Sequence, residues 1–335
     1  MENTLTCMHC GEIILGNNHG EEDFPLCRNC SSLYVTCEDC GRLILESTAR
    51  YPDDSDYPYC TSCFSSHEDN RIIHDYYYKP KPVFFGEGPR YFGVELEIDG
   101  AGEDENYAER ILNIANADSR YCMYAKHDGS LEEGIELVSA PLTLDYHLNK
   151  FPWGKVLNKA IDLGYTSHSS GTCGLHVHVS RKAFGDTVEE QDTCIARILY
   201  FFEAHWNELL RFSRRTESQL NQWAARYGYK EQPQEILKTA KSGYGNGRYS
   251  CINLQNRDTI EFRIFRGTLK LNTLLATLQL VDYICDVALF MSDAEIKRLS
   301  WSAFVSGITQ PELIQYLKER SLYINEPVRV TEEEM

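Results

Sequence analysis

The sequence predicts an α+β protein in which a sheet-containing domain follows a small cysteine-rich module. Eight of the 13 cysteines fall within the first 63 residues, as four Cys-x-x-Cys pairs. Beyond residue 90, short segments with alternating apolar and polar residues, typical of strands, are separated by longer segments with the apolar spacing of helices. The length of 335 residues suits two domains.

The composition is that of an acidic protein with enough apolar surface to fold. It has 33 basic and 50 acidic side chains, a formal net charge of -17, 42% apolar and 12% aromatic residues. Because attachment to nucleic acid or anionic lipid needs clustered lysine and arginine, we expect no nucleic acid and no membrane as partner. The N-terminus lacks the basic and apolar regions of a signal peptide, and no stretch approaches 18 consecutive apolar residues. These features predict a cytoplasmic protein.

The four cysteine pairs form a tandem duplication that predicts two zinc sites. The segment CMHCGEIIL returns as CEDCGRLIL, and FPLCRNC returns as YPYCTSC. In a reducing cytoplasm such pairs bind zinc rather than form disulfides, and two pairs complete a tetrahedral site of four thiolates. The predicted zinc ligands are Cys7, Cys10, Cys27, Cys30, Cys37, Cys40, Cys60 and Cys63.

Two arrangements of these pairs are open. Each repeat carries two pairs of its own, which favours sequential sites over a cross-braced arrangement that mixes the repeats. In both arrangements protein ligands fill every position, so the zinc is structural and leaves no position for water or substrate. The module resembles tandem zinc ribbons and LIM-like domains that dock proteins, although six residues separate Cys30 from Cys37 where LIM domains have two. We therefore predict a zinc-bearing adaptor.

The rest of the chain divides into a linker, a larger domain and a tail. The run YYYKPKPVFFGEGPR at 76–90 contains prolines and glycines and fits neither a helix nor a strand. We predict the zinc-binding module at 1–75, the linker at 76–90, the larger domain at 91–325 and an acidic tail at 326–335. Helical patterns occupy about 106–117, 154–163, 188–212, 271–291 and 311–320.

Three predicted strands share one design, with an apolar face and a charged face. They are YFGVELEID, CGLHVHVS and TIEFRIF. Because successive side chains of a strand point to opposite faces, the apolar residues of each segment share one face and its charged residues share the other. The charged faces carry Glu95, Glu97, His176, His178, Ser180, Glu261 and Arg263. If the strands join one sheet, these groups converge.

Two interpretations of the charged faces are open. Such a face often simply meets water. Ordinary solvated faces are rich in Thr, Lys, Ser and Gln, however, whereas Glu-x-Glu and His-x-His place like groups side by side. Carboxylates about 6 to 7 Å apart repel unless a cation lies between them. Glutamate oxygens with an imidazole suit magnesium or manganese, so we expect a divalent-metal site.

Two further segments add candidate groups. The segment KHDGSLEEGIELVSAP places Asp128 in a turn and Glu136 in the strand that follows. The glycine-rich run SGYGNGRYSCINLQN contains Arg248 ahead of a strand with Asn253, and such a run is able to approach phosphates closely. Asp128 is equally well explained as a turn residue without a ligand.

In their order along the chain, these motifs resemble the glutamine synthetase-like carboxylate-amine ligases, and among them the amidoligase family. The resemblance covers about residues 91–268 and rests on GVELE, on DGSL followed by GIELVS, on CGLHVHVS and on IEFRIFR. It implies a glutamine synthetase-like antiparallel sheet with one face packed by helices and a charged active-site face. It also implies an ATP-dependent enzyme that joins a carboxylate to an amine.

The resemblance implies roles for individual residues. Six match metal ligands that hold magnesium or manganese against the phosphates of ATP: Glu95, Glu97, Asp128, Glu136, His176 and Glu261. The implied nucleotide-binding residues are His178, Ser180, Arg248 and Arg263. The implied catalytic residues are Arg263, Arg266 and Glu136. An arginine that often lies two residues before the last metal ligand is absent, with Thr259 in its place.

The implied reaction activates a carboxylate, which is a poor electrophile with a poor leaving group at neutral pH. Phosphoryl transfer from ATP gives an acyl phosphate, provided that magnesium ions and arginines neutralise the charge of the carboxylate and the triphosphate. Attack by an amine then gives an amide or isopeptide bond, ADP and phosphate. The implied cofactors are ATP, Mg2+ or Mn2+, and two structural Zn2+.

The zinc module ahead of such a domain favours a peptide or protein substrate docked by that module, because free amino acids need no docking domain. A small carboxylate and amine are the other option. Two further classes of function are open as well. A metal-dependent hydrolase would use the same carboxylates and histidines to activate water, and a non-catalytic zinc-containing interaction protein would keep the fold without the reaction.

Overall fold

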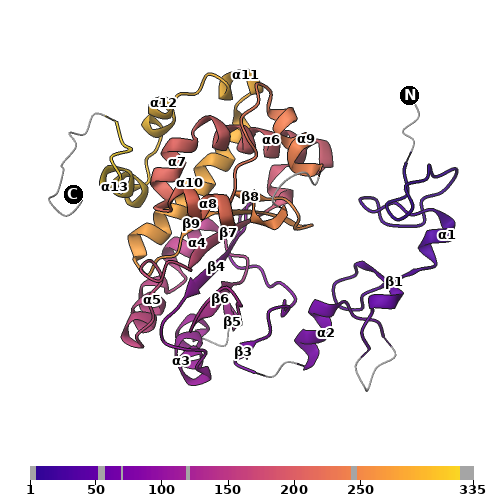
Figure 1. The fold of residues 1–335 in the computed structure, drawn as a ribbon, viewed down its shortest axis with the longest axis horizontal. Helices are drawn as coiled ribbons and strands as arrows, with labels where there is room; N and C mark the ends of the chain where they lie inside the picture. The colour runs from indigo at the N-terminus through magenta and orange to yellow at the C-terminus, as the bar shows by residue number, and fades with distance from the viewer. Residues whose placement is uncertain (1–4, 52–56, 69–70, 118–120, 243–246, 325–335) are drawn as a thin grey trace. The chain divides into compact units, whose positions relative to one another are not determined.

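A computed structural model describes residues 5–51, 57–68, 71–117, 121–242 and 247–324. The chain forms two compact units, Met1–Pro82 and Val83–Met335. The division between them lies inside the segment 76–90, for which we predicted a linker, and the predicted tail at 326–335 lies outside the described residues. Figure 1 labels the helices and strands of both units.

The N-terminal unit consists of short elements around two small cores. They are α1 (Arg28–Ser31), β1 (Tyr34–Thr36), β2 (Leu43–Leu45), the 3-10 helix η1 (Glu46–Thr48), α2 (Thr61–Glu68) and β3 (Ile73–His74). β1 pairs antiparallel with β2. Each core contains two buried cysteines and one larger residue, Leu26 in the first core and Tyr59 in the second. Because a core this small buries little apolar surface, the unit needs cross-links such as metal sites to be stable.

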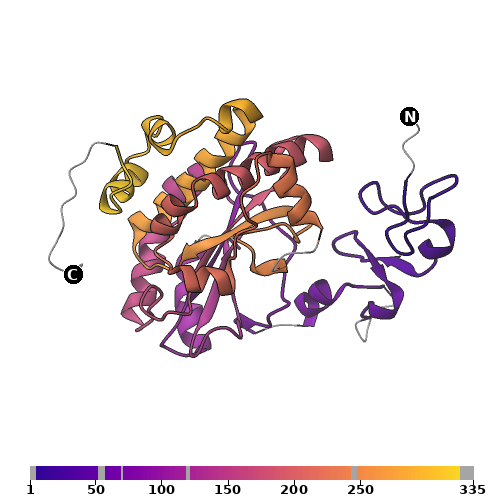
Figure 2. The same ribbon diagram turned by 45° about the horizontal axis from the view of Figure 1, so that its top comes forward.

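The C-terminal unit contains a sheet packed by helices (Figure 1, Figure 2). Its strands are β4 (Phe92–Ile98), β5 (Met123–Lys126), β6 (Ile135–Ser139), β7 (Gly174–Ser180), β8 (Ile252–Asn253) and β9 (Thr259–Arg266). Its helices of eight residues or more are α3 (Glu105–Ala115), α5 (Trp153–Asp162), α6 (Val188–Ala204), α7 (Trp206–Ser213), α9 (Pro233–Lys241), α10 (Leu271–Phe290) and α13 (Pro311–Glu319). Its shorter helices are α4 (Leu144–Asn149), η3 (Arg181–Phe184), α8 (Glu217–Trp223), η4 (Gly247–Tyr249), α11 (Asp293–Ile296) and α12 (Trp301–Ser306).

Within this unit the strands lie in the order β5-β6-β4-β7-β9-β8, and neighbouring strands are antiparallel. β4 is therefore central, between β6 and β7. Along the strands, every second residue is apolar and fully buried, as Leu96, Val177 and Phe262 are. Phe202 of α6 packs against Phe262, so helices cover the apolar face. The predicted α+β fold, with one helix-packed sheet face and one charged face, is confirmed.

The predicted helix at 188–212 is two helices. A capping box of Thr187 and Glu190 begins α6, which ends at Ala204, and His205 is its C-cap. The backbone of His205 (φ -117°, ψ 32°) leaves the helical range, and α7 starts at the next residue. Apolar residues continue across this break at helical spacing, which is why the sequence pattern did not reveal it.

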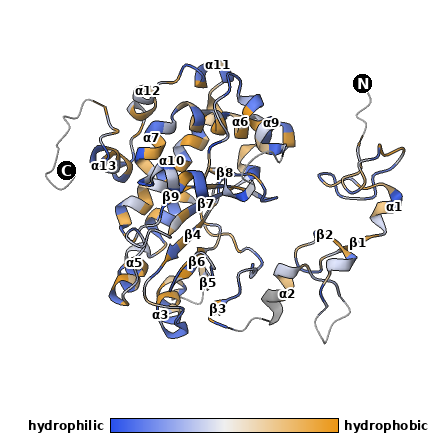
Figure 3. Cartoon of the chain, in the orientation of Figure 1, coloured by the Kyte–Doolittle hydropathy of each residue, from blue (hydrophilic) through white to orange (hydrophobic). Residues whose placement is uncertain are grey.

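Helix α10 is long and apolar enough to cross a membrane by length and composition alone, although the sequence shows no uninterrupted apolar stretch of that length. However, 72% of its most apolar window is buried inside the unit, as in the core helix of a globular domain. Figure 3 shows apolar and polar residues interspersed along the helices of this unit. This is the pattern of helices that turn one side to a core.

Two buried polar contacts attach the start of β4 to helices. The guanidinium of Arg90 donates to the carbonyl of Asp282 (2.9 Å) and to the carboxylate of Asp286 (2.8 Å), both in α10. His147 in α4 donates from Nε2 to the carbonyl of Phe92 (3.1 Å), and its Nδ1 accepts from the indole of Trp153 (3.1 Å). This arrangement requires a neutral imidazole, because Nδ1 must remain an acceptor.

The stability of the C-terminal unit should therefore depend on the protonation of His147. Burial lowers the pKa of His147 from 6.5 to about 4. As the pH falls, His147 takes up a proton near pH 6.5 in the unfolded chain but only near pH 4 in the folded chain. The free energy of unfolding therefore decreases as the pH falls from about 6.5 to about 4. We expect the free energy of unfolding to be about 2 kcal/mol lower at pH 5 than at pH 7.5 through this group.

Urea denaturation at the two pH values measures this difference. His147→Phe should be less stable at both pH values, because it loses two hydrogen bonds, but its stability should change less between them. An equal pH dependence in the variant and the wild type would contradict the assignment.

Candidate functional site

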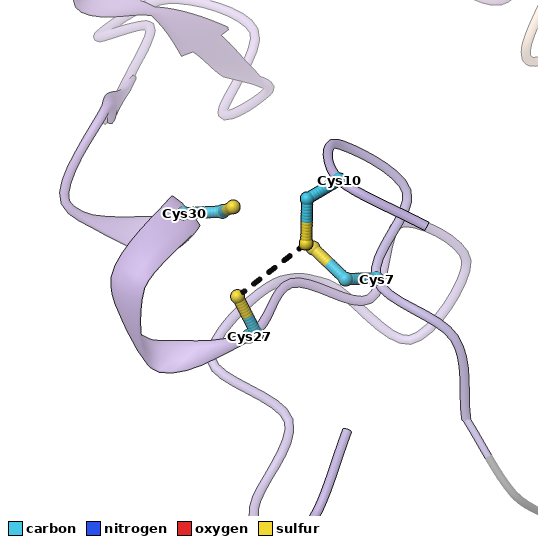
Figure 4. Close-up of side chains that lie close together, drawn as sticks. All are labelled: Cys7, Cys10, Cys27 and Cys30. Atoms are coloured by element: carbon cyan, nitrogen blue, oxygen red, sulfur yellow. Dashed lines mark hydrogen bonds between the residues drawn. The ribbon is translucent and has the colours of Figure 1, made fainter. Parts of the chain in front are cut away.

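Each repeat of the N-terminal unit brings four thiols together. In each group the Sγ atoms lie within 4.8 Å of one another. The groups are Cys7, Cys10, Cys27 and Cys30, and Cys37, Cys40, Cys60 and Cys63. Figure 4 shows the first group, in which the sulfurs of Cys10 and Cys27 are 3.9 Å apart. A tetrahedral zinc ion with Zn–S bonds of about 2.3 Å separates its sulfurs by about 3.8 Å, so each group fits one zinc ion.

The two groups are sequential, because each is formed within one repeat. The backbone of the repeats is equivalent: Cys7 donates its N–H to the carbonyl of Glu12 at 2.8 Å, and Cys37 makes the equivalent bond at the same distance. Gly11 and Gly41, which follow the first pair of each repeat, have φ of 76° and 70°, a conformation that favours glycine. The cross-braced arrangement is not the one found.

Backbone donors prepare one thiol of each group for metal binding. Burial raises the pKa of Cys7, but backbone N–H groups of Cys10, Cys27 and His9 outweigh it and lower the pKa to about 6. In the second group, the same combination lowers the pKa of Cys37 to about 7. Because the thiolate is the form that binds metal, these backbone donors favour the metal-binding form of Cys7 and Cys37.

On the sheet of the C-terminal unit, the register brings the predicted charged groups onto one face. Residues directly opposite each other in antiparallel strands share a face and lie close together. The opposing pairs are Glu95 with His176, Glu97 with Glu136, and His178 with Glu261. The strands β4, β6, β7 and β9 therefore place glutamates and histidines next to one another.

His176 lies at the centre of this face and belongs to two groups. Its Nδ1 is 3.4 Å from Oε2 of Glu95 and 3.6 Å from Oε1 of Glu261, and its Nε2 is 3.7 Å from Oε1 of Glu97. The potential ligand atoms of Glu95, His176 and Glu261 lie within 4.8 Å of one another, as do those of Glu97, Glu136 and His176. One imidazole thus joins two groups, and each group has the donors of a divalent-cation site. We call them together the carboxylate cluster.

Four of the five residues of the carboxylate cluster are buried, and Glu95 is half-buried. Glu136, His176 and Glu261 are 2%, 4% and 3% exposed. The interpretation in which these strand faces simply meet water is therefore wrong. Carboxylates that are buried and adjacent destabilise one another unless cations compensate them. Oxygen donors with one imidazole fit magnesium or manganese.

Two carboxylates of the cluster, Glu95 and Glu136, have pKa values that are shifted in opposite directions. Burial raises the pKa of Glu95, but His178, Lys126 and hydrogen bonds from the imidazoles outweigh it and hold the pKa well below its usual value. Burial and the charge of Glu95 raise the pKa of Glu136 well above its usual value, although Lys126 opposes this. One carboxylate therefore stays ionised while its neighbour favours the proton, as expected for like charges that share a site.

Lys126 of β5 is a site residue that the sequence analysis missed. Its Nζ lies 2.7 Å from Oε2 of Glu136, and its side chain is largely buried. In the strand MYAK, Lys126 alternates with the buried Met123 and Ala125, and it lies opposite Glu136 in the register. The alternation was a usable signal, but the segment was too short to be recognised as a strand of the sheet.

Two arginines approach the carboxylate cluster from different elements. Arg263 of β9 pairs with Glu261, and its Nε is buried without a hydrogen-bond partner among the described residues. Arg215, which follows α7, was not predicted. Its guanidinium and the Nε2 of His176 both lie 2.7 Å from the position that a Cβ would take on Gly174. Only a glycine at 174 leaves room for this approach.

Two asparagines orient Glu261. The side-chain amides of Asn253 and Asn256 donate to its Oε2 at 2.8 and 3.1 Å. Its other oxygen, Oε1, faces His176 and Arg263. The sequence analysis noted Asn253 in a strand and did not identify Asn256.

Asp128, Ser180 and Arg248 are among the predicted site residues that lie outside the carboxylate cluster. Asp128 accepts a hydrogen bond from the N–H of Ser130 (2.7 Å), as a turn residue does, and belongs to neither group of ligand atoms. Ser180 ends β7 opposite Thr259, whose hydroxyl lies 3.2 Å from Nδ1 of His178. Arg248 is exposed and lies over the ring of Tyr249, beside residues 243–246, which are outside the described residues.

A β-bulge determines where Arg266 lies. The register shifts so that Leu175 pairs with Phe265 while Val177 pairs with Phe262, which leaves two residues of β9 opposite His176. Strict alternation would put Arg266 on the apolar face with Phe262. The bulge instead places Arg266 opposite Gly174, which shares its face of the sheet with His176. Its guanidinium donates to the carbonyl of Arg214 (3.4 Å), away from Glu261.

The comparisons with known proteins agree with the predicted family. A family model described as "Putative amidoligase enzyme" matches residues 114–284, slightly more than half of the chain. Glu95 and Glu97 precede this segment, whereas the predicted site residues from Asp128 to Arg266 lie within it. Among curated proteins, none matches the chain in sequence.

The comparison with solved structures finds partial matches of low similarity. A bifunctional glutathione synthetase from Pasteurella multocida is 13% identical, with a TM-score of 0.38 over 69% of this chain and 46% of that one. GmaS without ligand is 13% identical, with a TM-score of 0.38 over 70% and 63%. The ligase PafA in complex with the prokaryotic ubiquitin-like protein Pup is 10% identical, with a TM-score of 0.30 over 69% and 56%. This chain spans less than two thirds of each.

The cysteine groups predict two zinc ions per chain. Metal analysis of the purified protein should find two, and a strong chelator should unfold the N-terminal unit, because binding free energy at such sites is folding free energy. Cys7→Ser should lower the content to one zinc and disrupt its own repeat, whereas Cys122→Ser, which changes a buried cysteine of the C-terminal unit, should leave two. A zinc content of none or one in the wild type would refute the assignment.

Proposed function

This chain belongs to the amidoligase family, and from that membership we propose that it is an ATP-dependent ligase that joins a carboxylate to an amine through an acyl phosphate. The observation that carries the proposal is the carboxylate cluster, in which His176 links two largely buried groups of side chains that could hold a metal ion. So many carboxylates need cations to neutralise them. A nucleoside triphosphate binds together with divalent metal ions, which would supply these cations.

We assign metal binding to the five residues of the carboxylate cluster: Glu95, Glu97, Glu136, His176 and Glu261. Magnesium or manganese held there would neutralise the triphosphate and polarise the transferring phosphoryl group. Asn253 and Asn256 keep Glu261 oriented for this task, and Lys126 holds Glu136. We do not assign metal binding to Asp128, because its carboxylate accepts a hydrogen bond from the backbone of Ser130 in a turn.

We assign the nucleotide to the end of β7 that carries His178 and Ser180. His178 lies between Glu95 and Thr259 there, with Nε2 3.3 Å from Oε1 of Glu95. Arg248, beside a glycine-rich segment, is proposed to contact phosphate when it leaves the ring of Tyr249. Arg263 is the residue proposed to stabilise the transferring group, because its unpartnered Nε is buried next to Glu261.

We propose that residues 1–75 dock a peptide or protein substrate, with 76–90 as linker and 91–325 as the ligase domain. The closed four-cysteine groups support this, since a site with four thiolates has no open position for chemistry and acts as a scaffold for a surface. The exposed apolar side chains Met8, Ile13 and Leu15 in the first repeat offer such a surface.

Nucleotide binding gives the first test. MgATP or MnATP at 100 times its Kd should stabilise the C-terminal unit by about 2.7 kcal/mol, measured as a rise in melting temperature. Glu95→Gln should abolish this rise, because it removes a proposed metal ligand, and it should lower the melting temperature without nucleotide only modestly, because the fold favours the ionised form of Glu95. Glu109→Gln, a matched change on the exposed side of α3, should behave as wild type. Unfolding of Glu95→Gln would show that the group is structural.

The reaction itself gives the second test. With carboxylate and amine supplied, release of ADP and phosphate should equal amide formation, and hydroxylamine in place of the amine should trap a hydroxamate. Arg263→Ala should slow ADP release by about 10³-fold or more, as for other arginines that stabilise a transferring phosphoryl group. Release of AMP and pyrophosphate would refute the acyl phosphate, and hydrolysis without ATP would indicate a metal-dependent hydrolase.

The same assay tests the docking role. Residues 83–335 alone should keep hydroxamate formation with a small carboxylate and show a raised KM only for a macromolecular substrate, because docking energy lies outside the chemistry. An unchanged KM for the macromolecule would remove the docking role and leave the ligase assignment intact.

A further inference from the structure

The two cysteine repeats of the N-terminal unit pack against each other. Tyr34 and Leu43 of the second repeat lie against the core of the first repeat, which contains the buried Leu26. Tyr34 belongs to β1 and Leu43 to β2, and the register of this hairpin puts both residues on one face, together with Leu45. We call this side of a repeat its hairpin face.

Polar contacts join the same two surfaces. The hydroxyl of Tyr34 lies 3.0 Å from Nδ1 of His9, and the ring of Tyr34 packs edge-on against Phe24, with 5.7 Å between the ring centres. The backbone N–H of Leu43 donates to Oε1 of Glu21 at 3.1 Å. The hairpin face of the second repeat therefore binds the core side of the first repeat through both apolar contacts and hydrogen bonds.

The first repeat carries the same hairpin. Its segment IIL corresponds to the strand LIL of β2, because CMHCGEIIL returns as CEDCGRLIL. Ile14, in the middle of the segment, packs against the core of its own repeat, as its equivalent Ile44 does in the second repeat. Because neighbouring residues of an extended segment point to opposite sides, Ile13 and Leu15 point away from that core and form the hairpin face of the first repeat.

The hairpin face of the first repeat is open to water. Ile13 and Leu15 are 58% and 95% exposed, whereas their equivalents Leu43 and Leu45 are half-buried. The described residues of the chain thus cover this face in one repeat and leave it uncovered in the other. Adjacent exposed apolar residues of this kind favour burial against a partner.

The complementary surface is open in the second repeat. Tyr57 corresponds to Phe24, because FPLCRNC returns as YPYCTSC. Phe24 is half-buried against Tyr34 of the following repeat, whereas Tyr57 is 60% exposed. Phe64 of α2 packs against the second core from within its own repeat and leaves Tyr57 exposed. The chain therefore contains this interface once and exposes one half of it on each repeat.

We propose that the hairpin face of the first repeat, at Ile13 and Leu15, binds the second repeat of another copy of this chain at Tyr57, in the way that the second repeat binds the first within one chain. The contact joins unlike surfaces, so the copies associate head to tail. Met8 lies between the first two cysteines, outside the hairpin face, and stays available for the substrate docking proposed above. The inference does not rest on the ligase reaction.

Charge opposes this association, and salt should therefore strengthen it. Residues 1–80 contain 14 acidic and 5 basic side chains, so two copies of the N-terminal unit repel each other. Salt screens such repulsion between exposed charges and leaves apolar contacts in place. Association that strengthens between about 50 mM and about 500 mM salt is the expected result.

Analytical ultracentrifugation of the full-length, zinc-loaded protein tests the proposal. Its average mass should rise beyond that of a dimer between about 10 µM and about 1 mM, because small interfaces associate weakly. Ile13→Asp and Tyr57→Asp should each stay monomeric, because each loses one half of the interface, but an equimolar mixture of the two should form dimers and stop there. Met8→Asp, a matched change at a residue that is 59% exposed, should associate as wild type. A zinc content of two in each variant shows that the repeats remain folded.

Three results would overturn the proposal: a wild-type protein that stays monomeric, a mass that stops at the dimer, and a mixture of the two variants that stays monomeric. A mass that stops at the dimer would instead indicate a symmetric contact between like faces. The docking role fails separately. A monomeric protein whose KM for a macromolecular substrate depends on residues 1–75 would remove the head-to-tail contact and keep the docking role, and association without such a dependence would do the reverse.

Discussion

Repulsion between buried carboxylates is the constraint on which the C-terminal unit depends. Glu95, Glu97, Glu136 and Glu261 surround His176 on the inner strands of one sheet, and all of them except the half-buried Glu95 are shielded from water. In a medium of low dielectric, such a group is unstable unless each charge has a partner. Cationic and amide side chains from several elements therefore lie next to these carboxylates.

These partners come from separate parts of the chain. Lys126 reaches Glu136 from the neighbouring strand, Arg263 reaches Glu261 along its own strand, and Arg215 approaches from the end of a helix across Gly174. Three cations do not neutralise four ionised carboxylates, and the raised pKa of Glu136 reflects this excess of negative charge. The remaining imbalance is what a divalent cation would relieve, and for this reason a site of this kind is more stable with its ligand than without it.

The two units are stabilised in different ways. The N-terminal unit has cores of only a few residues, and its cysteines are both its buried residues and its zinc ligands. The C-terminal unit has a full apolar sheet face packed against helices, so it is able to hold a destabilising group of charges on the opposite face. Functional groups that cost stability occur where a large core offsets them.

Sequence alone determined the elements whose signals are local. Cysteine spacing predicted both thiol groups, because ligands in a short repeat cannot lie far apart. Alternation along GVELE, CGLHVHVS and IEFRIFR predicted which residues share the charged face, because the period of a strand is two. The family also followed from these motifs in their order, and the match over residues 114–284 confirmed it.

Only the tertiary structure decided which of these groups meet and which join them from elsewhere. Arg215 and Lys126 belong to segments without a distinctive pattern, and they reach the carboxylate cluster through packing between distant parts of the chain. Asp128 fits the family motif by spacing, yet its carboxylate closes a turn. The bulge at His176 reverses the face of Arg266, and a single extra residue in a strand leaves no trace in the alternation before it. The alternation of residues along a strand can be seen in the sequence. The register between strands, and the contacts between residues that are distant in the sequence, depend on the whole fold.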